Sequence, residues 1–596
     1  ERRVQDRQSR YLYAVGRLAA GVSIGAAQSE MDAITAALAR EHPEFDRDWG
    51  VRLLPLRESL VGNARPVLLL LLGTVLLVLV IACANIANLQ LARAAARRHE
   101  MAIRSAIGAS SRDVLRQLIV EGSILSLAGG AAGVLLARGS LRALASWNAP
   151  GAEHVAIDAR VLLFTLGVSL ATGVVFGLVP ARAALRPDLL EVLRAQGRGA
   201  SAGAGDSRFR RLLTAGQIAT ALVLLIGAGL LLSSLARLQK VEPGFHPRGV
   251  TTLEVVLSSA RYADSERRAA FVRELVDRAS RAPGVASAGA VGQLPFGGSN
   301  STTGYSFEGL PPYPGGAPEA GFREVSPGFL GALEIPLIEG RDFSPRDTAE
   351  APPVVLVNRT FARRYWPRAS ALGQRIALSD GTKALREIVG VVADIRHTSL
   401  DVPAVPEIYV PFDQNAGDDV VLVARSGEAS AAVAARLRRV VASLDPDLPV
   451  FHVRTLESLL AASTARSRRM TELVGGFAAL ALVLAVLGVY SVISYSVARR
   501  GREFAIRLAI GSRRRDVLAL VLIEGMGVTL SGIGVGLALA WVATRLLASQ
   551  LFEVRADDPW TFLSTAAVLG VVALAACFIP AWRASRVSAI SALRAE

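Results

Sequence analysis

The sequence predicts an α-helical polytopic membrane protein with seven transmembrane helices and an α+β extracytoplasmic domain. Hydrophobic residues make up 52% of the 596 residues and are grouped in long runs. An internal repeat is the second observation, because Glu100-Met-Ala-Ile-Arg-Ser-Ala-Ile-Gly108 returns 403 positions later as Glu503-Phe-Ala-Ile-Arg-Leu-Ala-Ile-Gly511. Arginine in alternate loops is the third, and it orients the helices. Together these observations predict two fused copies of one membrane unit, arranged as a tandem parallel repeat.

Seven apolar stretches are each long enough to cross the roughly 30 Å hydrocarbon core of a bilayer. They cover residues 66–92, 120–147, 161–180, 212–236, 470–497, 520–548 and 562–580. The loops after the first, third, fifth and seventh stretches are rich in arginine, so we place those loops in the cytoplasm. Residues 1–65 and the long segment 240–467 then lie on the outer side of the membrane.

These spans divide the chain into six expected segments. They are 1–65, the C-terminal remnant of a first outer domain; 66–185, the transmembrane block of the first unit; 186–211, a cytoplasmic linker; 212–236, the first transmembrane helix of the second unit; 237–468, its outer domain; and 469–596, its transmembrane block. The second unit reads as one span, an outer domain and three spans. Because the chain starts at Glu1 rather than Met, we expect an incomplete N-terminus, with an eighth span and most of the first outer domain upstream.

The outer domain of the second unit mixes helices and strands, which predicts two lobes. Apolar spacing predicts helices at 265–280 and 431–443. Short β-rich runs predict strands at 354–357, 388–392, 420–423 and 450–453. Clusters of Gly and Pro at 295–318 predict loops, and the Gly, Ala and Ser of 196–207 predict a flexible linker.

The repeated motif predicts a short amphipathic helix at the cytoplasmic surface in each copy. Glu100 and Arg104 are four residues apart on the polar face, and Gly108 ends the helix. The second copy repeats this design with Glu503, Arg507 and Gly511, and Ser512 is available to cap the next helix. The motif continues into the following helix with Arg112 and Asp113 in the first copy and with Arg515 and Asp516 in the second. Two interpretations stay open: a membrane-lying elbow whose ion pair satisfies itself, and a docking surface for a cytoplasmic partner.

Small and polar residues inside the spans predict contacts between helices. Small-xxx-small spacing, which allows close helix approach, occurs at Gly129 and Gly133 and again at Gly532 and Gly536. Asn85 and Asn88 lie in the first span and are expected to hydrogen-bond to a neighbouring helix. Glu121 and Glu524 occupy matched positions near span entrances, either as functional carboxylates or as interfacial helix starts.

Several kinds of chemistry have no signal in the sequence. The net charge of +15 comes almost wholly from arginines beside apolar spans, so we expect bilayer anchoring and no nucleic-acid partner. Six histidines show no metal-ligand spacing, and Asp394 and His397 are expected to be a solvated loop pair. Neither a GxxxxGK[ST] phosphate loop nor a GxSxG nucleophile elbow occurs. We therefore expect no catalytic residue, metal or cofactor.

Both membrane blocks resemble the FtsX-like permeases of the macrolide-exporter (MacB) type. The resemblance is carried by EFAIRLAIGSRRRDVLALVLIEG and the Gly-rich span after it, and by Pro580-Ala581 with Ala592-Leu593-Arg594, echoed by Pro180-Ala181 with Val192-Leu193-Arg194. The outer segment resembles that family's periplasmic core domain through Glu324-Val-Ser-Pro-Gly-Phe329, Glu339-Gly-Arg-Asp-Phe343 and Val357-Asn358. The tandem copies are similar to the duplicated permeases found largely in acidobacteria.

The resemblance implies a permease subunit of an ABC-type mechanotransmission system in the bacterial inner membrane. In such systems a cytoplasmic ATPase dimer moves coupling helices, and periplasmic domains move in response. Carried over by position, the coupling helices are Glu100–Gly108 and Glu503–Gly511. MacB fuses its own ATPase to four spans, whereas this sequence has two permease units, so the ATPase is expected on a separate subunit and one chain would supply both protomers.

The resemblance leaves the activity open among three alternatives. Efflux of a hydrophobic or amphipathic compound is the expected activity. A signal transmitter that activates a periplasmic partner without transport, and a lipoprotein-releasing permease, are the others. The resemblance also leaves open whether a periplasmic adaptor binds.

Overall fold

The computed structural model describes residues 14–43, 50–56, 58, 65–96, 111–146, 157–184, 204–257, 261–309, 317–379 and 384–586. The chain divides into two compact units. Unit 1 comprises Glu1–Asn63 and Leu235–Arg469, and unit 2 comprises Ala64–Ser234 and Met470–Glu596.

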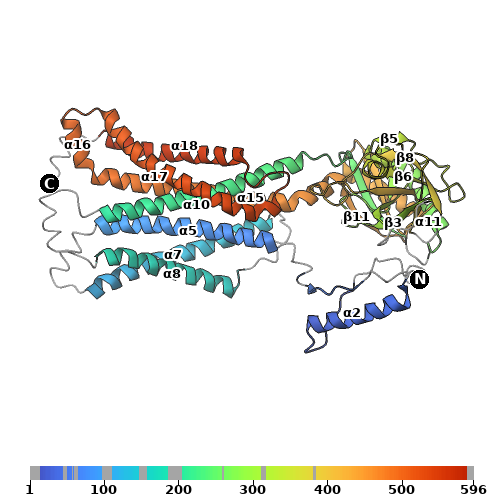
Figure 1. Ribbon diagram of the computed structural model, residues 1–596, viewed down its shortest axis with the longest axis horizontal. Helices are drawn as coiled ribbons and strands as arrows, with labels where there is room; N and C mark the ends of the chain where they lie inside the picture. The colour runs from blue at the N-terminus through green and yellow to red at the C-terminus, as the bar shows by residue number, and fades with distance from the viewer. Residues whose placement is uncertain are drawn as a thin grey trace. The chain divides into compact units, whose positions relative to one another are not determined.

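Unit 2 is a bundle of long helices that run side by side (Figure 1). They are α5 (Arg65–Ala96), α7 (Ser111–Ser146), α8 (Ala159–Ala184), α10 (Ala204–Gln239), α15 (Leu456–Arg499), α17 (Arg514–Ala543) with the 3-10 helix η3 (Thr544–Gln550), and α18 (Pro559–Ala584). Over their described residues, six of these helices are long and apolar enough to cross a membrane, and α8 contributes a shorter apolar segment, Ala159–Ala171. Each predicted span is therefore helical, and most of these helices continue beyond the apolar run because polar helix ends can lie outside the hydrocarbon.

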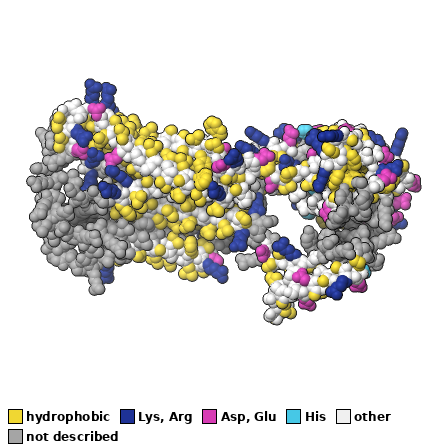
Figure 2. Space-filling view, in the orientation of Figure 1, with side chains coloured by type: hydrophobic (Ala, Val, Ile, Leu, Met, Phe, Trp, Pro, Cys, Tyr) yellow, Lys and Arg dark blue, Asp and Glu magenta, His cyan; other side chains and the backbone are white. Residues whose placement is uncertain are grey.

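Aromatic and basic side chains mark the two ends of α18. Trp560 lies at its start and is 78% exposed, while Trp582 near its end is 43% exposed. The Arg586 guanidinium lies 3.9 Å from the centroid of the Trp582 ring. Twenty-two residues of α-helix between the two Trp side chains span about 33 Å, which is close to a bilayer core. Figure 2 shows hydrophobic side chains covering the bundle between ends that carry arginine.

The second copy packs tightly around α10. Ile218, Leu222, Ile226 and Leu230 recur every four residues along α10, and all four side chains are fully buried. They form one apolar cluster with side chains of α15, α17 and α18.

Two glycines let α17 approach α10 closely. A Cβ built on Gly532 would lie 2.8 Å from the Ala215 carbonyl oxygen, and one on Gly536 would lie 2.9 Å from the Ala219 Cα. No larger residue fits at either position without a shift of α10.

The first copy does not repeat this contact at the expected glycines. Among the described atoms, nothing lies within 4 Å of a Cβ built on Gly129 or Gly133, whereas one on Gly130 would lie 2.7 Å from Ser169 Oγ of α8. The packing predicted for Gly129 and Gly133 is thus replaced by a contact one residue away. α10, which faces the glycines of the second copy, has no counterpart among the described residues of the first.

Unit 1 contains an eleven-stranded sheet. Its strands are β1 (Val250–Val256), β2 (Val285–Val291), β3 (Thr302–Phe307), β4 (Glu319–Val325), β5 (Leu337–Gly340), β6 (Val354–Asn358), β7 (Arg375–Leu378), β8 (Leu385–Val392), β9 (Glu407–Pro411), β10 (Asp419–Ser426) and β11 (Val450–Thr455). Strands β11, β1, β10 and β2 pair in that order, and α11 (Ser265–Ser280) and α14 (Ser430–Leu444) pack on them. Parallel pairing of β4 with β9 closes β4, β3, β7, β8, β6 and β9 into a ring. The two lobes predicted from the sequence are therefore an open sheet with helices and a closed ring of strands.

Most of the elements predicted for unit 1 are present. Helices α11 and α14 and strands β6, β8, β10 and β11 confirm the expected positions. The prediction of loops throughout 295–318 is wrong, because β3 lies inside that range and Tyr305 is buried against other aromatic rings. Helix α10 begins at Ala204, inside the stretch expected to be a flexible linker. Two short helices, α12 (Phe329–Leu333) and α13 (Arg359–Tyr365), complete the domain.

A separate helix, α2 (Ile24–Glu41), belongs to the segment 1–65. Ser23 Oγ accepts from the Ala26 amide at 3.2 Å and caps its start. The Gln28 amide then holds an extended segment, donating to the Val51 carbonyl at 2.7 Å and accepting from the Leu53 amide at 2.8 Å.

Candidate functional site

The short helix predicted from the second repeat motif is α16 (Gly501–Ala509), which lies at the turn between α15 and α17 (Figure 1). Phe504 and Ala505 are each 1% exposed and anchor α16 to the bundle. Ile506 and Ile510 point away from it, with exposures of 42% and 82%. Gly511 has φ of 101°, a left-handed conformation that ends the helix. An anchored helix thus presents an apolar face to its surroundings.

The polar side of α16 carries an ion-pair network. Glu503 accepts from Arg500 Nε at 2.8 Å and pairs with Arg507 Nη2 at 2.7 Å. The pairing of Glu503 with Arg507 confirms the contact predicted by their four-residue spacing. Hydrogen bonds from Arg500 lower the pKa of the Glu503 carboxyl below its ordinary value, so the carboxylate is charged at neutral pH.

Arg500 links α16 to two other helices. Its Nη1 donates to Glu524 Oε2 of α17 at 3.1 Å, and Glu524 Oε1 accepts from Arg211 Nη2 of α10 at 2.7 Å. Glu524 is therefore part of a charged chain that runs from α16 through α17 to α10. We call Arg500, Glu503, Glu524 and Arg211, together with Arg507, the cytoplasmic network. Its side chains are between 24% and 49% exposed, so each pair adds only about 0–1 kcal/mol of stability.

The start of α17 uses a different cap from the one expected. Arg513 occupies the N-cap position, and its backbone amide donates to Asp516 Oδ2 at 3.0 Å. Ser512 is therefore not the cap, because it lies one residue before the N-cap position. Arg515 and Asp516 are both exposed in the first turn of α17.

The corresponding motif of the first copy lies largely outside the described residues. Glu100, Arg104 and Gly108 fall within 97–110, and only the backbone of Arg112 and Asp113 is described, in the first turn of α7.

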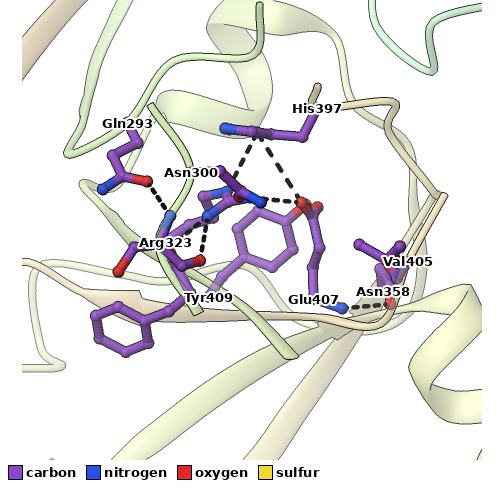
Figure 3. Close-up of polar contacts among 10 residues, drawn as sticks. Gln293, Asn300, Arg323, Asn358, His397, Val405, Glu407 and Tyr409 are labelled. Atoms are coloured by element: carbon purple, nitrogen blue, oxygen red, sulfur yellow. Dashed lines mark hydrogen bonds and ion pairs between the residues drawn. The ribbon is translucent and has the colours of Figure 1, made fainter. Parts of the chain in front are cut away.

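A second charged cluster lies inside the outer domain, and the sequence did not predict it (Figure 3). Arg323 of β4 and Glu407 of β9 are each 1% exposed, and Arg323 Nη2 donates to Glu407 Oε1 at 3.0 Å. Tyr409 donates to Glu407 Oε2 at 2.7 Å, and Asn300 Oδ1 accepts from Arg323 Nη2 at 2.7 Å. His397 Nδ1 accepts from Arg323 Nε at 3.2 Å. We call these five side chains the outer cluster.

Burial sets the protonation states of the outer cluster. It lowers the pKa of His397 to about 3, with the Arg323 charge acting in the same direction, so the imidazole is neutral. Burial also raises the pKa of Glu407, while Arg323 opposes that rise. His397 was expected in a solvated loop pair with Asp394; that expectation is wrong, because His397 is 6% exposed and Asp394 Oδ1 accepts from the Thr360 amide. The sequence of β4, Glu319-Ala-Gly-Phe-Arg-Glu-Val325, contains no signal that its arginine is buried.

Family comparisons agree with these two units. Residues 72–189 and 475–589 each match the family described as FtsX-like permease C-terminal, and residues 213–440 match the MacB-like periplasmic core domain. These segments span most of the chain, and the outer domain of unit 1 is of the periplasmic type. The chain is therefore a multi-span membrane permease of the FtsX-like class, with that permease segment present twice.

The chain is similar to part of several proteins that are named as export ATP-binding/permease proteins. It is 27% identical over 289 residues to the probable syringafactin export ATP-binding/permease protein SyfD of Pseudomonas syringae pv. tomato, covering 46% of this chain and 42% of that protein. It is 28% identical to the macrolide export ATP-binding/permease protein MacB of Bdellovibrio bacteriovorus, covering 46% and 43%. The chain spans less than half the length of these relatives. The periplasmic region of MacB from Actinobacillus actinomycetemcomitans aligns with 37% of this chain and 95% of its own at 14% identity, with a TM-score of 0.25. The membrane segments of the chain thus match the FtsX-like permease family, and its outer domain matches the MacB-like periplasmic core domain.

Proposed function

We propose that this chain is the permease subunit of an ABC-type mechanotransmission system in the bacterial inner membrane. A separate cytoplasmic ATP-binding subunit, acting as a dimer, docks on α16 and its first-copy counterpart. The motion of the ATP-binding subunit moves the periplasmic domain, and this movement extrudes a hydrophobic or amphipathic compound. The observation that carries the proposal is α16 itself, an anchored helix with the exposed Ile506 and Ile510 on one side and the cytoplasmic network on the other.

A continuous helix supports the mechanical part of the proposal. α15 runs from Leu456 to Arg499, about 66 Å, and α16 follows it directly. Its first residues, Leu456 and Leu459, are buried in the apolar core of the outer domain. α15 is one continuous helix with residues in both units, and we propose it as the route by which a displacement of α16 reaches the outer domain.

Tight packing between the copies supports helix motion rather than conduction through the bundle. Ile81 of α5, Ala221 of α10 and Ala481 of α15 are fully buried in one cluster. The same packing suits the second candidate, a transmitter that moves its outer domain to activate a periplasmic partner without transport. Stimulation of ATP hydrolysis by an exported compound would favour efflux, and stimulation by a periplasmic protein alone would favour the transmitter.

Copurification tests the docking step. The full chain is solubilised from its native membranes, and the bound ATP-binding subunit is identified by photolabelling with azido-ATP and mass spectrometry. We expect the charge reversal Glu100→Arg with Glu503→Arg to abolish that association, because it repels Arg507 and Arg500 and unseats α16. The matched reversal Glu350→Arg with Glu457→Arg, on exposed outer-domain positions, should leave it unchanged. Association that survives the first pair would refute α16 docking.

A further inference from the structure

We propose that the two copies within one chain pair with each other through α5 and α15, and that the unlike residues Asn85 and Gly488 restrict this pairing to one copy of each kind. Pairing of this sort requires no second chain. It is also independent of what the permease moves, so its failure and that of the proposed function are distinguishable.

Equivalent positions of α5 and α15 face each other. In the register of the repeat, Ile81 corresponds to Leu484 and Asn85 to Gly488. Asn85 Nδ2 donates to the Leu484 carbonyl at 2.8 Å. Gln217 Nε2 of α10 donates to the Ile81 carbonyl at 3.1 Å. The two equivalent carbonyls each accept from a side-chain amide, but the donors differ: Asn85 of α5 serves the Leu484 carbonyl, and Gln217 of α10 serves the Ile81 carbonyl.

Apolar packing follows the same axis. Val78 and Ala481 are also equivalent in the repeat register, and both lie in the cluster that joins α5, α10 and α15. Ile81 and Ala481 are fully buried there. Like positions of α5 and α15 thus enter the same apolar cluster at a second level of the helices.

The symmetry is broken at one position. A Cβ on Gly488 would lie 2.5 Å from Gln217 Oε1 and 3.0 Å from Asn85 Oδ1, so a larger residue at this position would displace these two side-chain amides. Two first copies would bring two Asn85 amides into the space that holds one. Two second copies would place Gly488 against Gly488, which leaves a void. The Leu484 carbonyl would then also lack the Asn85 amide as its donor. Because water is absent from the bilayer core, neither defect can be filled by solvent.

Disulfide trapping in the full chain tests the pairing. Val78→Cys and Ala481→Cys are introduced after replacement of Cys83 and Cys577 by serine, and a protease site is inserted within 196–203. After oxidation in lipid nanodiscs and cleavage, we expect the two halves to stay joined without reductant. In cells that produce two differently tagged chains, joined halves should carry the tags of one chain.

Variants with a single cysteine test the alternative, in which like positions of two separate chains pair with each other. We expect Val78→Cys alone and Ala481→Cys alone to give little disulfide-linked dimer of chains. Dimers through like positions, at a yield comparable to that of the 78–481 product, would overturn the proposal. So would joined halves that come equally from two chains.

The role of Gly488 is tested on the same helix. Gly488→Leu should lower the yield of the 78–481 disulfide about fivefold or more, because overpacking a closed contact shifts an equilibrium by at least that factor. Gly476→Leu is the matched control, since a Cβ at Gly476 meets no described atom within 4 Å. Equal effects of the two substitutions, whether both lower the yield or neither does, would overturn the specificity assigned to Gly488.

Discussion

The outer cluster and the cytoplasmic network are built from the same residue types and differ in exposure. Arg323 and Glu407 are each 1% exposed, whereas Arg500 and Glu503 have side chains 35% and 38% exposed. A buried pair cannot separate without leaving an unpaired charge in an apolar interior, so the outer cluster fixes β4, β9 and the loop that carries Asn300. An exposed pair exchanges its partner for water at little cost. The difference indicates that charge holds the outer domain rigid and leaves α16 able to move.

Removing the buried arginine should give the largest effect of any substitution considered. Arg323→Met leaves Glu407 buried without its partner, which we expect to cost the outer domain about 3–5 kcal/mol. Hydrogen-exchange protection of β4 and β9 in the full chain measures the loss. Arg281→Met is the control, because the Arg281 side chain is 78% exposed and pairs at 2.7 Å with Asp277, whose side chain is 42% exposed, so it should cost at most about 1 kcal/mol. Similar losses in the two variants would contradict the contrast between buried and exposed pairs.

Glycines in a close helix contact and glycines outside one should likewise differ in their tolerance of a larger side chain. Gly532→Leu forces a side chain into the contact between α17 and α10 and should destabilise the solubilised chain by about 1–3 kcal/mol. Gly534→Leu lies two residues away on the same helix, where a Cβ meets no described atom within 4 Å, and should be nearly neutral. Thermal unfolding in detergent compares the two, and equal midpoints would show that close packing is not needed there.

Acid should loosen the outer cluster through His397. Its folded pKa is about 3 against an ordinary value of 6.5, so below pH 6.5 the unfolded chain binds a proton that the folded domain does not. The contribution of His397 to the free energy of unfolding is therefore complete above pH 6.5 and is lost as the pH falls towards 3. Glu407 acts in the opposite direction, because its pKa is raised.

A non-titrating substitution isolates the histidine. Between pH 6 and pH 5, we expect the wild-type domain to lose up to about 1.4 kcal/mol more than His397→Gln, whose amide can still accept from Arg323. Exchange protection of β4, corrected for the intrinsic rate at each pH, gives this difference. An identical pH dependence of the two proteins would show that His397 is not the group that titrates.

Neutralising the Glu503 carboxylate of α16 should have the smallest effect on stability. Glu503→Gln weakens two half-exposed ion pairs while Arg500 keeps Glu524, so the cost should stay below about 1 kcal/mol. Glu274→Gln, which weakens the exposed pair with Arg278, is the matched control in thermal unfolding. A loss of several kcal/mol would mean that the cytoplasmic network is structural rather than movable.

The sequence was most informative where a local pattern determines structure. Apolar length predicted the spans, helical spacing predicted α11 and α16, and the four-residue separation of Glu503 and Arg507 predicted their ion pair. Contacts between segments far apart in the sequence could not be predicted from local patterns. Arg323 and Glu407 are 84 positions apart and meet only because β4 pairs with β9.

The sequence also did not predict the structural differences between the two copies. Identical spacing predicted equal roles for Gly129 and Gly532, yet a close helix neighbour is present only at Gly532 among the described residues. Sequence spacing defines which face of a helix is small, but the neighbouring helix decides whether that face is used.

Photo-crosslinking from α16 tests the central claim, that this helix receives the ATP-binding subunit. A photoreactive residue replaces Ile510, which is 82% exposed, or in the control Trp560, which is 78% exposed and lies at the far end of α18. On irradiation of membranes containing the full chain, we predict capture of an ATP-binding subunit from position 510 and none from position 560. Capture from 560, or none from 510 when that subunit copurifies with the chain, would contradict the account.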